Sequence, residues 1–290
     1  MTLALQALLS SLVNGSVYVI IGIGIVLCYR GSRVVNLAQG ETFSLSGLLT
    51  GKLFAIGLPL AAASVVGVAA AVVGSLLFER LALRSRLDWN PRRLIIVALG
   101  VALLAEGAFD LFLGANTYNF PAMLNGPSVL IGGGAISQQG VLLVALSVVT
   151  TVGLVWFFRS TLLGHAMTAC AENPQASASL GINVARMRQL SFGLAGLIGG
   201  ISALLLVPLT GVSYDAGLTI TLNGFVAAAL ANMTHPGRVL WAGMGLAIGE
   251  GYIGAYWNPL YEVPVVFGLV LLVGVLYLSR GVRFGGAVRA

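Results

Sequence analysis

The sequence predicts an all-α fold, a polytopic membrane helix bundle that forms a single domain over residues 1–290. Hydrophobic residues make up 58% of the chain and charged residues only 8%, and the mean hydropathy is +0.98. A soluble domain carries roughly a quarter of its residues as charged side chains, so a water-soluble globular protein is excluded. The basic residues are dispersed without interleaved aromatic residues, which argues against nucleic-acid binding. In a membrane protein they set the orientation instead.

Six apolar runs are each long enough to cross a hydrocarbon core of about 30 Å as a helix. They cover residues 3–28, 58–78, 94–113, 140–158, 190–209 and 263–279. The first basic residue, Arg30, follows the first run, so we expect that run to be retained rather than cleaved as a signal peptide. Three further stretches are ambiguous: residues 42–57 and 219–233 are short, and residues 239–256 carry Glu250 and five glycines. Nine segments result if all three cross, and eight if one short segment is re-entrant.

Arginine placement orients the bundle, because short arginine-rich loops stay in the cytoplasm. Arginines concentrate in residues 79–93 and 159–190, which are predicted to be cytoplasmic loops. Residues 114–139 carry no charge and are rich in Gly, Asn and Pro, as is typical of an outer loop. Nine crossings then place the N-terminus outside and the arginine-containing C-terminal tail inside.

In this threading, residues 3–28 run inward and residues 190–209 run outward, and each run is followed by a polar connection and one of the short segments. That order predicts an inverted-topology repeat with short or broken helices. Paired broken segments mark a substrate path, since irregular backbone at membrane depth needs protein or a water-filled cavity around it. The alternative is a pair of ordinary short helices in a thin, tilted bundle. Close helix packing is further predicted by the pairs Gly47/Gly51, Gly196/Gly200 and Gly245/Gly249.

Residues 164–190 break with their surroundings because they are polar and rich in Ala and Ser. Asn173 suits a helix N-cap and Pro174 the first helical turn, so a short helix is predicted over residues 175–180, ended by Gly181 in a left-handed conformation. A second helix is predicted to start at Asn183 and continue into the next span. A short capped helix at the end of a bundle fits a docking site for a soluble partner; the alternative is that it only caps the bundle.

Several kinds of chemistry are absent from the sequence. Residues 47–52 resemble a phosphate-binding loop but are one residue short, and the two histidines, His165 and His235, have no second metal ligand at a suitable spacing. We therefore expect no metal site, no catalytic site and no cofactor bound by this chain. Glu106 lies deep in a span and needs a partner or a cavity. It is a candidate path residue, whereas Asp110 is near the outer end and is expected to face water.

Three segments resemble the permease subunits of branched-chain amino-acid ABC importers, specifically the smaller of their two permease types. Residues 164–183 (GHAMTACAENPQASASLGIN) are similar to the family's cytoplasmic loop, with its Asn-Pro and Gly-Ile pairs. Residues 35–41 (VNLAQGE) resemble the family's Ile-Asn-Phe-Ala-His-Gly-Glu, and residues 224–230 (GFVAAAL) resemble its Phe-x-Ala-Ala-x-Leu segment. The motifs occur in the family's order, so the resemblance covers nearly the whole chain.

The resemblance implies an importer subunit of a bacterial inner membrane that pairs with a second, non-identical permease, two cytoplasmic ATPases and a periplasmic binding protein. ATP and magnesium would then bind the ATPases, not this chain. The residues that would couple to an ATPase are Glu172, Asn173, Pro174, Ala176, Leu180 and Gly181. The residues that would border the substrate path are Asn36, Gln39, Gly40, Glu41, Asn223, Gly224 and Phe225, together with Glu106.

The sequence departs from the family pattern at three places, and these bear on the cargo. Gln39 replaces the usual His, Ala231-Asn232 replaces two glycines, and Glu106 places a carboxylate in a span. The predicted cargo is a branched-chain amino acid or a related small polar or carboxylate solute. The alternative function is an ion-coupled secondary transporter that uses Glu106. A membrane aspartyl protease is disfavoured, because the order of the aspartates and the glycine pattern are wrong for one.

Overall fold

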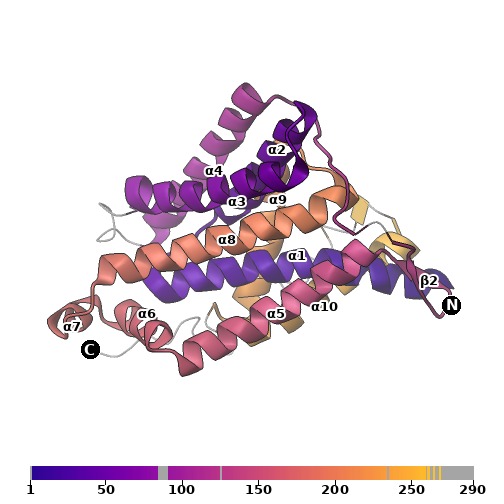
Figure 1. Ribbon diagram of the computed structural model, residues 1–290. Helices are drawn as coiled ribbons and strands as arrows, with labels where there is room; N and C mark the ends of the chain where they lie inside the picture. The colour runs from indigo at the N-terminus through magenta and orange to yellow at the C-terminus, as the bar shows by residue number, and fades with distance from the viewer. Residues whose placement is uncertain are drawn as a thin grey trace.

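The computed structural model describes residues 2–83, 91–124, 126–233 and 235–258, and single positions at 260, 261, 264 and 268. It is a helix bundle with one small hairpin (Figure 1). In chain order the elements are α1 (Thr2–Ser32), α2 (Gln39–Ala55), α3 (Leu60–Leu77), the π-helical turn η1 (Phe78–Leu83), α4 (Pro91–Leu113), β1 (Val129–Ile131), β2 (Gly134–Ile136), α5 (Gln138–Ser160), α6 (Leu162–Glu172), α7 (Pro174–Ser179), α8 (Val184–Thr210), α9 (Ala216–Leu230) and α10 (Pro236–Tyr256).

The predicted all-α membrane bundle is confirmed. Within the described residues, five helices are long and apolar enough to cross a membrane: α1, α3 with η1, α4, α5 and α8. Each predicted span in these residues corresponds to a helix, and the short segments appear as α2 and α9. The predicted span over residues 263–279 and the C-terminal tail fall outside the described residues, apart from two single positions.

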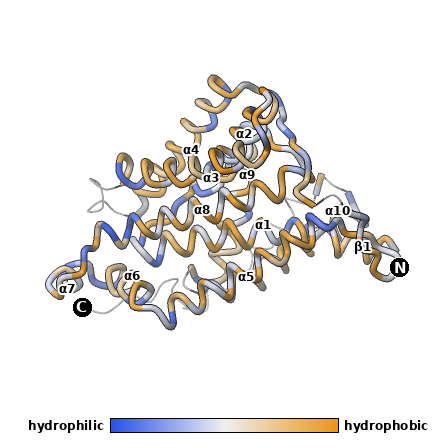
Figure 2. The backbone as a smooth tube through the Cα atoms, viewed as in Figure 1, coloured by the Kyte–Doolittle hydropathy of each residue, from blue (hydrophilic) through white to orange (hydrophobic). Residues whose placement is uncertain are grey.

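Helix α1 forms the centre of the bundle, and its residues 19–28 are buried on all sides. Ile20, Ile21, Ile23 and Ile25 are fully buried although they point in different directions around the helix. A helix that is apolar all round lies in a core, and α1 packs against α5, α8, α9 and α10. The outer helices α3, α4 and α5 expose large apolar side chains instead, and Figure 2 shows the hydrophobic colour over much of their length. Such a surface suits lipid or another membrane subunit.

The packing agrees with the predicted inverted repeat. Helices α1 and α8 run antiparallel beside each other, as Figure 1 shows, and α2 and α9 follow them. Helix α3 packs against α8, and its counterpart α10 packs against α1. Helix α2 also contacts α8, as α9 contacts α1, and the two short helices touch each other. The unit α1–α3 and the unit α8–α10 therefore make equivalent contacts with each other.

Two of the three predicted glycine pairs lie at close contacts. On α8, a Cβ added at Gly196 would lie 2.8 Å from the Ala71 carbonyl oxygen of α3, and one at Gly200 would lie 3.0 Å from the Ala71 Cβ. Gly47 and Gly51 of α2 are equally close to neighbouring side chains. An added Cβ at Gly245 or Gly249 on α10, in contrast, would meet no atom of the described residues within 4 Å, so the described part of the chain shows no close contact for that pair.

The loop between α4 and α5 contains a short hairpin that the sequence reasoning missed. Strand β1 pairs antiparallel with β2, with Leu130 opposite Ala135. Gly132 and Gly133 connect the strands with positive φ values of 56° and 92°, as a tight two-residue turn requires. The Gln6 side chain holds the hairpin against α1, because it accepts from the Ala135 amide at 2.8 Å and donates to the Ala135 carbonyl at 3.1 Å.

Candidate functional site

Helix α2 begins inside the bundle, where buried polar side chains hold its first turn. Gln39 is fully buried and donates from Nε2 to the Ala195 carbonyl of α8 at 2.9 Å. Asn36 donates from Nδ2 to the Gln39 Oε1 atom at 3.2 Å, and its own Oδ1 accepts from the Ala38 amide at 3.0 Å. Because buried polar groups are costly without partners, this hydrogen-bonded set fixes the chain at the point where α2 starts. Gln39, which replaces the family's usual His, is thus a structural link to α8.

The first turns of α2 and α9 meet directly, and we call residues 36–41 with residues 217–221 the helix crossing. The Gly40 amide donates to Thr221 Oγ1 at 2.8 Å, and that hydroxyl donates to the Gly217 carbonyl at 2.8 Å. A Cβ added at Gly40 would lie only 2.0 Å from the Gly217 carbonyl oxygen. Only glycine therefore permits this approach, which brings together two segments about 180 residues apart in sequence.

Glu41 lies in the helix crossing with its carboxylate against α9. The side chain is 5% exposed, and among the described residues neither carboxylate oxygen has a hydrogen-bond partner. A Cβ added at Gly217 would lie 2.5 Å from both oxygens. The positive end of a helix dipole favours a negative charge, and Glu41 is close to two such ends. Its unused acceptor atoms leave it able to bind a donor or a cation.

A second carboxyl group reaches the same end of α9. Glu106 of α4 is half-buried, and its carboxyl group interacts with the backbone of Leu218 in the first turn of α9. It is also close enough to Glu41 and to Asp215 for their charges to interact. The structure therefore brings the predicted path residues Glu41 and Glu106 together, although they are far apart in sequence and on different helices.

The remaining predicted path residues lie farther along α9, where it packs on α1. A Cβ added at Gly224 would lie 3.0 Å from the Gly22 amide nitrogen, so the two backbones nearly touch. The Asn223 side chain is buried, and its Oδ1 has no hydrogen-bond partner among the described residues. Phe225 is half-buried against the core. These three residues form a second group, separate from the helix crossing.

The predicted coupling helix is present almost as expected, as α7 over Pro174–Ser179. Asn173 is its N-cap, and its side chain accepts from the Ala176 amide at 2.9 Å. Leu180 is the C-cap and Gly181 has a φ of +82°. The amides of Gly181 and Ile182 donate to the Ala178 and Ser177 carbonyls, both at 3.0 Å, which is the Schellman pattern that closes a helix. The predicted second helix also begins as expected, since Asn183 caps α8 by accepting from the Arg186 amide at 3.0 Å.

The predicted coupling residues are presented on the surface. Helix α7 lies at the end of the molecule opposite the N-terminus (Figure 1), and Leu180 at its tip is 80% exposed. The other predicted coupling residues, Glu172, Asn173, Pro174, Ala176 and Gly181, are exposed as well. Ser177 is buried and holds the inner side of α7 against the bundle. We call residues 172–181 the coupling segment.

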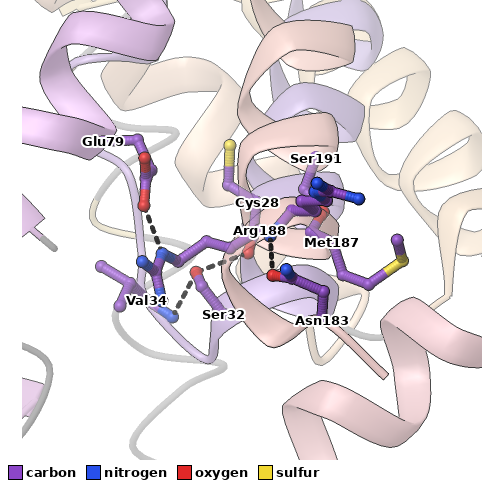
Figure 3. A network of polar contacts seen from close by, with 9 residues as sticks. Cys28, Ser32, Val34, Glu79, Asn183, Met187, Arg188 and Ser191 are labelled. Carbon is purple, nitrogen blue, oxygen red and sulfur yellow. Dashed lines mark hydrogen bonds and ion pairs between the residues drawn. The ribbon is translucent and has the colours of Figure 1, made fainter. Parts of the chain in front are cut away.

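One ion pair near this segment was missed by the sequence reasoning. Arg188 of α8 donates from Nε to the Glu79 carboxylate of η1, and both side chains are buried (Figure 3). The sequence predicted loops at both positions, whereas Glu79 lies in η1 and Arg188 in the first turns of α8. The sequence did contain a signal for this pair. Glu79 directly follows the predicted span 58–78 and Arg188 lies just before the predicted span 190–209, so the two opposite charges are predicted at the same side of the membrane.

The described part of the chain holds no candidate metal site. No three His, Cys, Asp or Glu side chains come together there in a way that would hold a metal ion. Cys28 and Cys170 are both free and buried. The chemistry of the site therefore consists of hydrogen bonding, helix-end charge and two carboxyl groups.

Comparison with known proteins identifies the family of this chain. Residues 7–278 match the family described as the branched-chain amino acid transport system permease component. The chain is 27% identical to the high-affinity branched-chain amino acid transport permease BraD of Pseudomonas aeruginosa, over 96% of this chain and 95% of BraD. It is 28% identical to the corresponding permease LivH of Escherichia coli K12, over 96% of this chain and 94% of LivH.

A solved structure, PsaBC from Streptococcus pneumoniae in complex with Fab, aligns with a TM-score of 0.48 and 14% identity over 92% of this chain and 89% of that one. The family match spans nearly all of the sequence. The chain therefore belongs to the family of permease components of branched-chain amino-acid transport systems, and it is a multi-pass membrane transport subunit rather than an enzyme.

Proposed function

We propose that this chain is one permease subunit of an ATP-driven importer in a bacterial cytoplasmic membrane, with its N-terminus outside and its C-terminus inside. Its cargo is a branched-chain amino acid or a related small polar or carboxylate solute. Its partners are a second, non-identical permease, two cytoplasmic ATPases and a periplasmic binding protein. The observation that carries the proposal is the pairing of a buried polar helix crossing with an exposed, capped coupling segment in one bundle.

The helix crossing suits a zwitterionic amino acid. Helix N-termini bind carboxylates through free backbone amides and the helix dipole, and α2 and α9 both begin there. Glu41, with unused acceptor atoms, and Glu106 supply carboxyl oxygens for an ammonium group. In the proposed path the solute passes beside the first turns of the two short helices, bordered by Asn36, Gln39, Gly40, Glu41 and Glu106. Asn223, Gly224 and Phe225 border the part next to α1.

The coupling segment provides the mechanical input. In the proposed cycle, closure of the ATPases on ATP displaces α7, and the bundle alternates between outward- and inward-open states. Helix α7 is rigid because it is capped at both ends. The buried Arg188–Glu79 pair ties the start of α8 to η1, and so to α3. In the proposed cycle, displacement of α7 moves α8, which lies against α2 at the helix crossing.

The test is uptake of radiolabelled leucine, isoleucine and valine into proteoliposomes. We expect uptake by the complete complex with binding protein outside and ATP inside, and none by this chain alone. Uptake by the chain alone, driven by a proton or sodium gradient and lost in Glu106→Gln, would establish the secondary transporter instead. If none of the three amino acids is taken up but another solute is taken up in an ATP-driven manner, the proposed cargo is wrong and the proposed ATP-driven importer is retained.

A further inference from the structure

A cavity of about 780 Å³ lies between the ends of α1, α5, α6 and α10, away from the helix crossing. It is in the size range of sites that bind small ligands or headgroups. Its walls come from residues near the predicted cytoplasmic end of each helix, and Glu172 at the start of the coupling segment belongs to its rim. The cavity therefore adjoins the part of the molecule that would receive the ATPases.

The cavity is strongly basic. Arg30, Arg33, Arg159 and Arg238 line it, against one carboxylate, Glu172. Among the residues that the structure describes, the ion pair within 4 Å is that of Glu79 with Arg188, so these four guanidinium groups have no such partner there. Three of these arginines act on one neighbour: the pKa of His235 is lowered by partial desolvation and by the charges of Arg238, Arg30 and Arg159. An anion placed in the cavity would meet several cations at once.

Two of the arginines are held in position. The Arg30 guanidinium lies 4.0 Å from the centroid of the Phe158 ring and donates to Thr168 Oγ1 at 3.2 Å. Arg33 donates from Nε to the Ala171 carbonyl at 3.2 Å. Each contact uses only part of the five N–H donors of a guanidinium group. The remaining donors are thus pre-oriented, which favours the bidentate binding of phosphate oxygens.

One wall of the cavity indicates where its ligand comes from. Val155 of α5 and Trp241 of α10 belong to the lining, and Trp241 is 78% exposed. Exposed tryptophan is typical of the membrane–water interface, and basic pockets between helices at that level bind anionic lipid headgroups. A soluble anion would gain nothing from this apolar, aromatic wall, whereas the acyl chains of a lipid would lie along it.

We propose that this cavity binds the phosphate headgroup of an anionic phospholipid of the cytoplasmic leaflet. Arg30, Arg33, Arg159 and Arg238 contact the phosphate, and the acyl chains lie along Val155 and Trp241. The bound lipid joins α1, α5, α6 and α10, and so steadies the base of the coupling segment. The proposal rests on the orientation given under the proposed function, but not on the cargo or on transport.

The test is native mass spectrometry and thermal unfolding of the delipidated full chain, titrated with phosphatidylglycerol, phosphatidylcholine or inorganic phosphate. Phosphatidylglycerol is expected to bind and to raise the unfolding temperature, and the other two are not. The variant Arg159→Gln/Arg238→Gln removes two exposed charges and should weaken phosphatidylglycerol binding about tenfold or more. Arg186→Gln, which removes an exposed arginine outside the cavity, should bind like the wild type.

Three results would overturn the proposal. The first is equal lipid binding by the double variant and the wild type. The second is an equal rise in unfolding temperature with inorganic phosphate, which would identify a soluble anion. The third is loss of ATPase binding in the double variant with lipid binding unchanged, which would assign the cavity to an acidic surface of the ATPase. None of these measurements requires transport, so failure of the proposed cargo would leave them interpretable.

Discussion

The helix crossing and the coupling segment are both marked by sequence motifs, yet the structure uses the two motifs in opposite ways. In the helix crossing the motif residues are buried, and Gly40 and Thr221 join two helices with no room for another atom. In the coupling segment the motif residues shape a short helix and then face outward, with Leu180 at the tip. Substitutions should therefore damage stability in the first region and partner binding in the second.

The buried ion pair joins the start of α8 to η1, and breaking it should have the largest effect on stability. Arg188→Met leaves Glu79 buried without its partner, which costs about 3–5 kcal/mol of unfolding free energy. Thermal unfolding in detergent should show this as a large drop in melting temperature. Glu79→Leu/Arg188→Met should recover most of the loss, because no charge remains buried. Equal stability of the single and double variants would show that the pair does not hold α8 to η1.

A single added methyl group should break the helix crossing. In Gly40→Ala the new Cβ would meet the Gly217 carbonyl oxygen at 2.0 Å and Thr221 Oγ1 at 2.3 Å. Overpacking of this kind costs about 1–3 kcal/mol, and the upper end is expected because the neighbour is backbone. The measurement is again the melting temperature in detergent. The matched control is Gly245→Ala, whose Cβ meets no atom of the described residues within 4 Å; an equal drop in both variants would contradict the tight crossing.

At the coupling segment the same kind of measurement should show no change in stability. Leu180→Asp alters an exposed tip and is expected to leave the unfolding free energy within about 0.5 kcal/mol of the wild type, so that the melting temperature barely changes. Binding of the ATPase subunits should weaken about thirtyfold, as for the loss of about 2 kcal/mol at an interface hot spot. Leu180→Met keeps an apolar tip and should bind normally. Unchanged ATPase binding by Leu180→Asp would remove the tip from the interface.

The smallest expected effect concerns the cap of α7. Asn173→Ala removes the side chain that accepts from the Ala176 amide, which costs about 1 kcal/mol. The amides of α7 should then exchange with deuterium several-fold faster in hydrogen-exchange mass spectrometry, while those of α8 keep their rates. Asn173→Asp retains an acceptor and should exchange like the wild type. Unaltered exchange in Asn173→Ala would mean that α7 is held by contacts other than its cap.

Much of this architecture could be predicted from local sequence. Hydropathy located the helices because a membrane span is a property of a continuous run, and Asn173, Pro174 and Gly181 predicted α7 because capping acts between near neighbours. The sequence did not predict the Glu79–Arg188 pair, since a charge beside an apolar run looks water-facing until its partner in space is known. The convergence of Glu41 and Glu106 on α9 depends on the tertiary arrangement in the same way.

The glycine pairs show the limit of the pattern itself. Gly196 and Gly200 lie against α3, but Gly245 and Gly249, at the same spacing, meet no neighbour among the described residues. The pattern indicates which helix face permits a close neighbour, and it does not identify the element that packs there. The short hairpin beside α1 was missed for a related reason, because it is held from outside by Gln6 across more than a hundred residues of sequence.

The central claim is that the helix crossing acts on the solute and the coupling segment binds the ATPases. It is tested most directly by measuring ATP hydrolysis and leucine uptake together in the reconstituted complex. Glu41→Gln should retain the stimulation of hydrolysis by loaded binding protein and lose at least tenfold in uptake, because the Glu41 carboxyl group acts only on the solute at the helix crossing. Leu180→Asp should lose both, because ATPase binding fails. Wild-type uptake by Glu41→Gln, or stimulated hydrolysis by Leu180→Asp, would contradict the account.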